Sequence, residues 1–131
     1  MEPATHLRID RGLCGAPGDL AEGSATVELR TTPSMAVDDR GLVHGGFVFG
    51  AADHAAMLAV NDPHVVLGSA DTRFTAPVAV GDVVVLTATR TAVDRRKHTV
   101  EVVGAVDGRT VFTGTFATFV LDAHVLDGRT S

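Results

Sequence analysis

One stretch near the middle of the chain limits what the rest can become. Residues 46–60 are predicted to form a single helix, opened by two glycines and apolar on every side. A helix that is hydrophobic all round is normally buried, because a surface helix keeps one polar face. Asp53 and His54 are the only ionisable residues in it. An ionised carboxylate in an apolar interior is costly unless it is paired or used. Asp53 is therefore the first candidate for a functional residue.

The segments around this helix have the pattern of strands. Residues 24–31 alternate apolar and polar side chains, as a strand with one buried face does. The helix is expected to stop at Asn61-Asp62-Pro63, because proline disfavours helical geometry in the residue before it. Beyond this point, segments rich in Val, Thr and Phe and bounded by turn residues predict four more strands. They are residues 65–75, 83–93, 98–106 and 109–121.

This order of elements predicts an α+β fold in which one helix lies on one face of an antiparallel sheet. Asp107-Gly108 between the last two strands is a strong hairpin signal and makes that pair antiparallel. The 131 residues fit one domain, residues 1–131. Residues 1–23 are rich in glycine and are expected to be mostly irregular.

Composition argues against several classes of protein. The formal net charge is −5 and Trp and Tyr are absent, whereas nucleic-acid-binding domains are usually basic and often carry stacking aromatic residues. The longest apolar run is shorter than a membrane span and contains Asp53, so no membrane segment is expected. The N-terminus lacks the pattern of a secretory signal, and the single cysteine, Cys14, has no partner for an internal disulfide. We therefore expect a cytoplasmic protein. No metal-binding spacing of His, Asp or Cys is present, so no metal site is expected.

Several motifs together resemble a known family. His44-Gly45-Gly46 is followed by Asp53 nine residues after the histidine, and Asn61 closes the helix. Residues 69–78 read Ser-Ala-Asp-Thr-Arg-Phe-Thr-Ala-Pro-Val, and Gly81-Asp82 follows them. These motifs resemble the PaaI-like acyl-CoA thioesterases of the hotdog superfamily, and the resemblance covers about residues 24–121. It implies the hotdog fold, an antiparallel sheet wrapped around one long central helix.

A second resemblance concerns a smaller group of hotdog proteins. Residues 45–53, 111–116 and 120–126 are similar to a less characterised subgroup that includes flagellum- and virulence-associated bacterial proteins. This subgroup implies acyl-CoA binding rather than turnover. The resemblances therefore lead to two functions: an acyl-CoA thioesterase, or a non-catalytic acyl-CoA-binding or regulatory protein. A hotdog hydratase or dehydratase is less favoured, because no Asp/His pair has the spacing expected for that reaction.

Thioester hydrolysis requires a group that activates water and donors that hold the developing oxyanion. Asp53 is the candidate for the first role, as general base or as nucleophile, and a structural carboxylate is the competing interpretation. Gly45 and Gly46 suit the second, because the first N–H groups of a helix lack helical partners and glycine lets a ligand come close. The resemblance implies Gly46 as the principal donor. His44 either orients the loop before the helix or contacts substrate, and capping or packing explains it equally well. His54 points about 100° away from Asp53 and is predicted to be structural or to lie at an interface.

The spacing of these groups has a consequence for assembly. Gly46 and Asp53 are seven residues apart, which corresponds to roughly 10 Å along one helix. Oxyanion donors must lie about 3 Å from the oxyanion. Two antiparallel helices related by a two-fold axis would bring Gly46 of one subunit to Asp53 of the other. We therefore expect a homodimer, or a dimer of dimers, with composite sites at the interface.

Candidates for substrate binding fall into two groups. Coenzyme A, which enters as part of the substrate and not as a separate cofactor, carries phosphates that need cations. Arg73 and the turn Arg95-Arg96-Lys97 are candidates, although a solvated basic turn explains the latter equally well. Four apolar residues are candidates for lining an acyl pocket or belong to the core: Phe47, Phe49, Met57 and Phe74.

Overall fold

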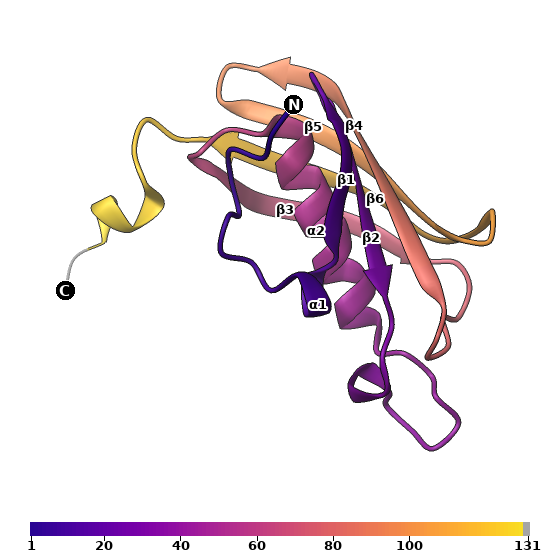
Figure 1. Cartoon of the computed structure of the whole chain (residues 1–131). Coiled ribbons are helices and arrows are strands. Elements are labelled where there is room, and N and C mark those ends of the chain that lie inside the picture. The colour runs from indigo at the N-terminus through magenta and orange to yellow at the C-terminus, as the bar shows by residue number, and fades with distance from the viewer. Residues whose placement is uncertain (130–131) are drawn as a thin grey trace.

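The computed structural model describes residues 1–129, and it shows a six-stranded sheet wrapped around one long helix (Figure 1). The central helix is α2 (Gly45–Val60). The strands are β1 (Ala16–Ala21), β2 (Ser24–Arg30), β3 (Val65–Phe74), β4 (Val83–Asp94), β5 (Lys97–Val106) and β6 (Arg109–Val120). Their order in the sheet is β1-β2-β4-β5-β6-β3, and every neighbouring pair is antiparallel. The predicted hotdog fold is confirmed.

The central helix is buried along most of its length, as its all-round apolar sequence predicts. It begins at Gly45, one residue earlier than expected, and ends at Asn61, whose φ of 54° places it in the left-handed region. The backbone N–H of Asn61 donates to the carbonyl of Met57 and so closes the last turn. Nine residues of the helix are buried: Val48, Ala51, Ala52, His54, Ala55, Ala56, Met57, Leu58 and Ala59.

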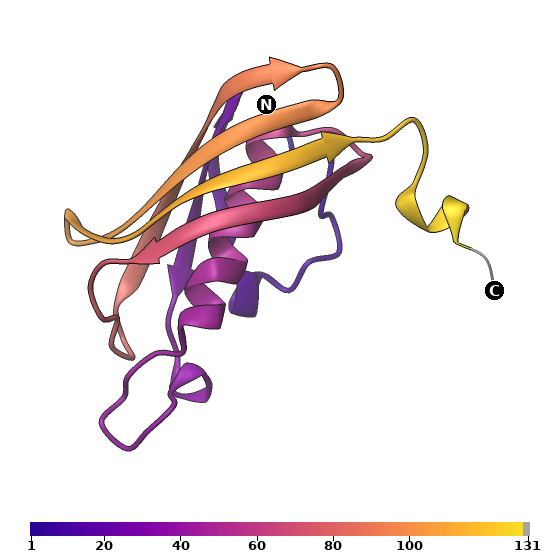
Figure 2. The same ribbon diagram turned by 180° about the vertical axis from the view of Figure 1, so that it is seen from behind.

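The sheet turns its apolar side chains towards α2. Along β4, Val84, Leu86 and Ala88 are fully buried, while Val85 and Thr87 between them are exposed. Residues of a strand point alternately to its two faces, so this pattern fixes which face meets the helix. Figure 2 shows the other face of the sheet, over which none of the described helices lies.

The hairpin between β5 and β6 forms where the sequence predicts it. Asp107 and Gly108 both have positive φ, 48° and 80°. A two-residue hairpin turn of this kind requires positive φ at both central residues, which is why Asp-Gly is favoured there.

The prediction that residues 1–23 are mostly irregular is wrong for two segments. A short helix, α1 (Arg11–Cys14), is capped by the Asp10 carboxylate, which accepts a hydrogen bond from the backbone N–H of Leu13. The segment after it forms β1, an edge strand that pairs with β2 and shifts register between Pro17 and Leu20. Glycine and proline indicated a loop, but an edge strand tolerates proline, whose missing N–H faces away from the ladder.

Candidate active site

The start of α2 carries two backbone donors that have no acceptor in the described chain. Within residues 1–129, the N–H groups of Gly45 and Gly46 donate no hydrogen bond. His44 is the residue before the helix, and its side chain makes no capping hydrogen bond. The next donor, the N–H of Phe47, is already bonded to the carbonyl of His44 at 3.1 Å. Because the helix dipole favours negative charge at this end, the two glycine N–H groups form a ready anion-binding pair.

Two rings flank these glycines. A Cβ atom on Gly46 would lie 2.8 Å from Nε2 of His44, and one on Gly45 would lie 3.1 Å from Cε1 of Phe74. Phe74 is 54% exposed, and its ring makes an edge-to-face contact with the buried ring of Phe112 at a centroid distance of 5.3 Å. A side chain at either position would have to displace one of these rings, and neither glycine has an unusual φ.

Asp53 lies two turns further along α2 and is half-buried. Its Oδ1 atom is buried and has no hydrogen-bond partner within residues 1–129. Burial raises the pKa of the Asp53 carboxyl from 3.8 to about 6. A buried polar atom without a partner requires an explanation, and a carboxyl with a pKa close to the working pH is suited to proton transfer.

His54 faces a different environment from Asp53, in agreement with the structural role predicted for it. It is 1% exposed, and its Nδ1 atom lies 3.1 Å from the carbonyl oxygen of Cys14. Its ring stacks on His6 at a centroid distance of 6.0 Å, and burial lowers the pKa of His54. The N-terminal segment therefore packs on α2 through His54. Burial and then the charges of Asp10 and Asp53 raise the pKa of the Cys14 thiol, which places Cys14 near Asp53 as well.

Comparison with known proteins assigns a family to this arrangement. The family model described as the acyl-CoA thioesterase N-terminal domain matches residues 33–120, the segment that carries both α2 and the strands after it. The chain belongs to the hotdog thioesterase superfamily.

Three solved structures resemble this hotdog protein over most of its length. An uncharacterized protein from Pyrococcus horikoshii is 50% identical, with a TM-score of 0.96 over 97% of this chain and 98% of that one. A sigma28-regulated virulence protein from Campylobacter jejuni is 31% identical, with a TM-score of 0.92 over 95% and 89%. A mutant of the phenylacetic acid degradation protein PaaI from Thermus thermophilus is 30% identical, with a TM-score of 0.76 over 83% and 95%. Both groups that the sequence resembles are therefore among its structural relatives.

A curated relative is much longer than this chain. A protein of Aquifex aeolicus named methylthioribose-1-phosphate isomerase is 48% identical over 124 residues, which are 93% of this chain but 27% of that protein. The hotdog chain thus spans about a quarter of the relative's length. The match concerns that part of the Aquifex protein alone.

The hotdog fold brings together only some of the predicted substrate-binding residues. Phe47 is half-buried and contacts the ring of His44 edge-to-face at 6.0 Å, so it lies at the α2 start together with Phe74. Phe49 is half-buried, with its ring 5.7 Å from that of Phe116. Met57 is 1% exposed and belongs to the core, which was the alternative left open for it.

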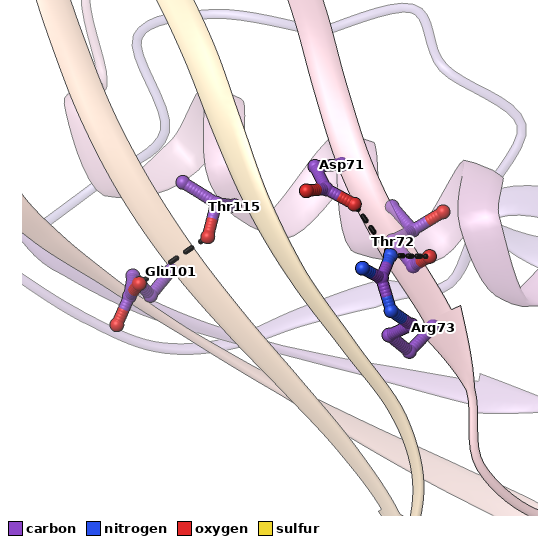
Figure 3. A network of polar contacts seen from close by, with 5 residues as sticks. All are labelled: Asp71, Thr72, Arg73, Glu101 and Thr115. Atoms are coloured by element: carbon purple, nitrogen blue, oxygen red, sulfur yellow. Dashed lines mark hydrogen bonds and ion pairs between the residues drawn. The ribbon is translucent and has the colours of Figure 1, made fainter.

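The predicted cations do not point to the α2 start of their own chain, although Arg73 directly precedes Phe74, whose ring lies there. Arg73 pairs with Asp71 on the sheet face opposite α2, where Thr115 also donates to Glu101 on a neighbouring strand (Figure 3). The turn Arg95-Arg96-Lys97 lies at the far end of the sheet, where Arg96 pairs with Asp122 and its carbonyl accepts from the N–H of Val120. The C-terminal end of α2 lies at the same end of the sheet. The backbone N–H of Leu121, just after β6, donates to the carbonyl of His64, which is only four residues beyond the last helical residue, Val60.

A hollow beside the α2 start was not predicted from the sequence. It measures about 390 Å³, and its lining includes Arg40, Leu42, Val78 and Arg109. The backbone N–H of Val43 donates to the carbonyl of Val78, which fixes the loop before α2 against the loop after β3. These residues are distant in sequence and belong to no motif, so only the fold reveals the hollow. Within residues 1–129, no cluster of His, Cys, Asp or Glu is placed to hold a metal ion, and no helix has the length and apolar character needed to cross a membrane.

Proposed function

We propose that the protein is an acyl-CoA thioesterase in which Asp53 activates water and the Gly46 N–H, assisted by that of Gly45, holds the oxyanion. The observation that carries this proposal is the buried, unpartnered Oδ1 of Asp53 on a helix whose first two N–H groups are also unpartnered. Membership of the hotdog thioesterase superfamily supplies the reaction class. Coenzyme A is part of the substrate, and no separate cofactor takes part.

The reaction needs one proton to travel through Asp53. The Asp53 carboxylate takes a proton from water while the water oxygen bonds to the thioester carbon, and the negative charge that forms on the carbonyl oxygen is held by the glycine N–H groups. When the tetrahedral intermediate collapses, the carbon–sulfur bond breaks. The leaving sulfur then receives the proton from Asp53, which restores the carboxylate and releases a free acid and a thiol.

A homodimer brings these groups together. The strand β3 forms one edge of the sheet along ten residues, and an edge of this length invites pairing with another strand. Two-fold pairing of β3 with its copy would continue the sheet and set the two α2 helices antiparallel on the same face. Gly46 of one subunit would then approach Asp53 of the other, which the roughly 10 Å between them along one helix prevents within a chain.

The same symmetry gives the cationic turn a role. Antiparallel pairing brings the end of one chain that carries Arg95-Arg96-Lys97 to the end of its partner at which α2 starts. The turn is therefore proposed to attract the coenzyme A phosphates of a substrate bound at the partner's helix. Phe47 and Phe74, which lie at the α2 start, are proposed to contact the acyl group.

The test is thiol release from short, long and aromatic acyl-CoAs by the wild type, Asp53→Asn and a matched control, Asp71→Asn, whose carboxylate lies on the opposite sheet face. Loss of turnover in Asp53→Asn alone, with acyl-CoA binding retained in calorimetry, supports the enzyme. Equal slow rates in all three proteins with binding retained would instead establish the non-catalytic acyl-CoA-binding protein. An active monomer in sedimentation would contradict the composite site.

A further inference from the structure

The C-terminal arm, residues 121–129, stands away from the body of the protein. It leaves the end of β6, passes the end of β3 and turns towards the side of the sheet on which β3 has its free edge (Figures 1 and 2). Its first two residues are held in place by the hydrogen bond from the N–H of Leu121 to the carbonyl of His64 and by the ion pair between Arg96 and Asp122.

The outer part of the arm is held by its own hydrogen bonds. The imidazole Nδ1 of His124 accepts from the N–H of Leu126, and the carbonyl of His124 accepts from the N–H of Asp127. These bonds shape the short 3₁₀ helix Val125–Gly128, which presents Val125 and Leu126 with 51% and 57% of their surface exposed. The segment is ordered by local hydrogen bonds and exposes two adjacent apolar side chains followed by a carboxylate. Such a segment is suited to docking on another surface.

The hollow beside the α2 start has the complementary chemistry. Leu42, Pro77 and Val78 supply apolar lining, and Arg40 and Arg109 supply positive charge. Within residues 1–129 neither arginine forms an ion pair.

Two carboxylates also line the hollow, but both are engaged by their own turns. Asp38 accepts hydrogen bonds from the N–H groups of Arg40 and Leu42, and Asp82 accepts one from the N–H of Ala79. The hollow thus carries two positive and two negative charges, but its carboxylates are held in their turns, whereas within residues 1–129 neither guanidinium group forms an ion pair. An apolar lining with two such guanidinium groups matches the sequence Val125-Leu126-Asp127.

The arm cannot reach the hollow of its own chain. The arm starts where Val65 of β3 pairs with Val120, whereas the hollow lies beyond the other end, where Phe74 pairs with Phe112. The ten residues of β3 span about 33 Å, whereas the six residues from Leu121 to Leu126 span about 22 Å at most, even when fully extended.

In the proposed dimer, the arm is long enough to reach the hollow of a partner. Pairing of the two β3 edges about a two-fold axis near the strand centre reverses the second chain, so its hollow comes to the end at which the first chain's arm begins. The β6 strand that continues into the arm and the partner's β6 strand, which starts at the hollow with Arg109, are then three strand spacings apart, or about 14 Å, which is less than the reach of the arm. Resting on the dimer of the proposed function, we infer that each C-terminal arm docks Val125 and Leu126 in the hollow of a second copy of this chain, with Asp127 facing Arg40 and Arg109. The two arms then hold the two subunits together next to the composite active sites, an arrangement that we call the clasp.

The test is a disulfide cross-link between arm and hollow. Leu42→Cys and Leu126→Cys are combined in a Cys14→Ser background, oxidised with copper phenanthroline at low protein concentration, and run on a non-reducing denaturing gel. Each single-cysteine variant is the matched control. A covalent dimer that forms faster in the double variant than in either control, with the 42–126 link found by peptide mass spectrometry, supports the clasp.

The other outcomes overturn the proposal in distinguishable ways. A protein that sediments as a dimer and yields no more cross-link than the controls has a dimer without the clasp. A link formed within one chain also overturns the clasp. A protein that sediments as an active monomer overturns both the clasp and the composite site.

Discussion

The ring of Phe74, at the end of an edge strand, lies against Gly45 at the start of the central helix. A Cβ atom at position 45 would lie 3.1 Å from Cε1 and 3.4 Å from Cδ1 of this ring. The Phe74 ring packs edge-to-face against the buried ring of Phe112, so it has little room to move towards the core. The contact thus couples the sheet edge to the two backbone donors of the candidate site.

Gly45→Ala is therefore expected to lower thiol release without unfolding the protein. The added methyl group would displace either the ring or the first turn of α2, and so shift the donors from the oxyanion. Loss of one such donor costs about 10² to 10³ in kcat in a well-studied protease, so a partial displacement should cost about tenfold. Gly50→Ala is a stability control, because a Cβ there meets no atom of its own chain within 4 Å. It should add about 0.5–1 kcal/mol to the free energy of unfolding, which shows whether α2 tolerates an added methyl group. A Gly45→Ala protein with the wild-type kcat would contradict the role of Gly45.

The pH dependence of thiol release should follow the Asp53 carboxyl. Its pKa is raised to about 6 by burial, and only the carboxylate form can take a proton from water. The wild-type kcat/KM should therefore rise as the pH increases through about 6 and be level above pH 7. Steady-state rates measured from pH 4.5 to 8.5 check this. Residual activity of Asp53→Asn should lack the step, and a step that survives in this variant would assign the titration to another group.

Ionisation of the same carboxyl should lower the free energy of unfolding at neutral pH. Because the folded-state pKa of Asp53 is raised from 3.8 to about 6, the folded state holds this proton more tightly than the unfolded state. The contribution of Asp53 to stability is thus full below pH 3.8 and is lost as the pH rises to about 6, by about 3 kcal/mol. Asp53→Asn should raise the free energy of unfolding by an amount of this order at pH 7.5, and by little at pH 4. Denaturant unfolding at both values is the measurement. A variant that is equally stabilised at both pH values would show that charge burial is not the cause.

The sequence determines much of the fold because its decisive signals are local. An all-round apolar helix and an Asp-Gly turn with two positive φ angles are each encoded within a few residues, as are the spacings that place Gly46 and Asp53 on one helix. The strand β1 was not predicted because Pro17 and Gly18 indicate a loop. In the structure, a Cβ on Gly18 would lie 2.5 Å from Oγ1 of Thr26, so this glycine permits a close approach between strands.

The hollow and the direction of Arg73 depend on contacts between distant segments. Arg73 points to the outer sheet face because strand register and the pairing with Asp71 place it there. Arg40 and Arg109 meet only because the loop before α2 bonds to the loop after β3. No spacing within the sequence carries such information.

The N-terminal segment should loosen when Asn61 is replaced. The Asn61 side chain accepts a hydrogen bond from the N–H of Ala4 and donates one to the carbonyl of Glu2, while its backbone ends α2 with a positive φ. Asn61→Gly keeps the helix end, since glycine adopts this φ freely, and removes both bonds. Hydrogen exchange at the Ala4 amide should therefore become faster in Asn61→Gly. Asn61→Asp is the matched control because it retains the acceptor for that amide, and unchanged exchange in both variants would mean that other contacts hold the segment.

The C-terminal arm offers a prediction that separates docking from general surface hydrophobicity. If Leu126 is buried against a second copy, Leu126→Ser should weaken the dimer, because burying a leucine side chain contributes about 1.5–3 kcal/mol and each 1.4 kcal/mol corresponds to a tenfold change in Kd. The expected rise in the dimer Kd is about tenfold or more, measured by sedimentation at several concentrations. Val103→Ser is the control, since Val103 is 45% exposed, near the 57% of Leu126, but lies on β5 on the sheet face opposite α2. The comparison is informative because loss of exposed apolar surface would alter both variants alike, whereas a docked arm responds only to the change at position 126. A charge reversal, Asp127→Arg, should add to the effect of Leu126→Ser by placing a third cation beside Arg40 and Arg109.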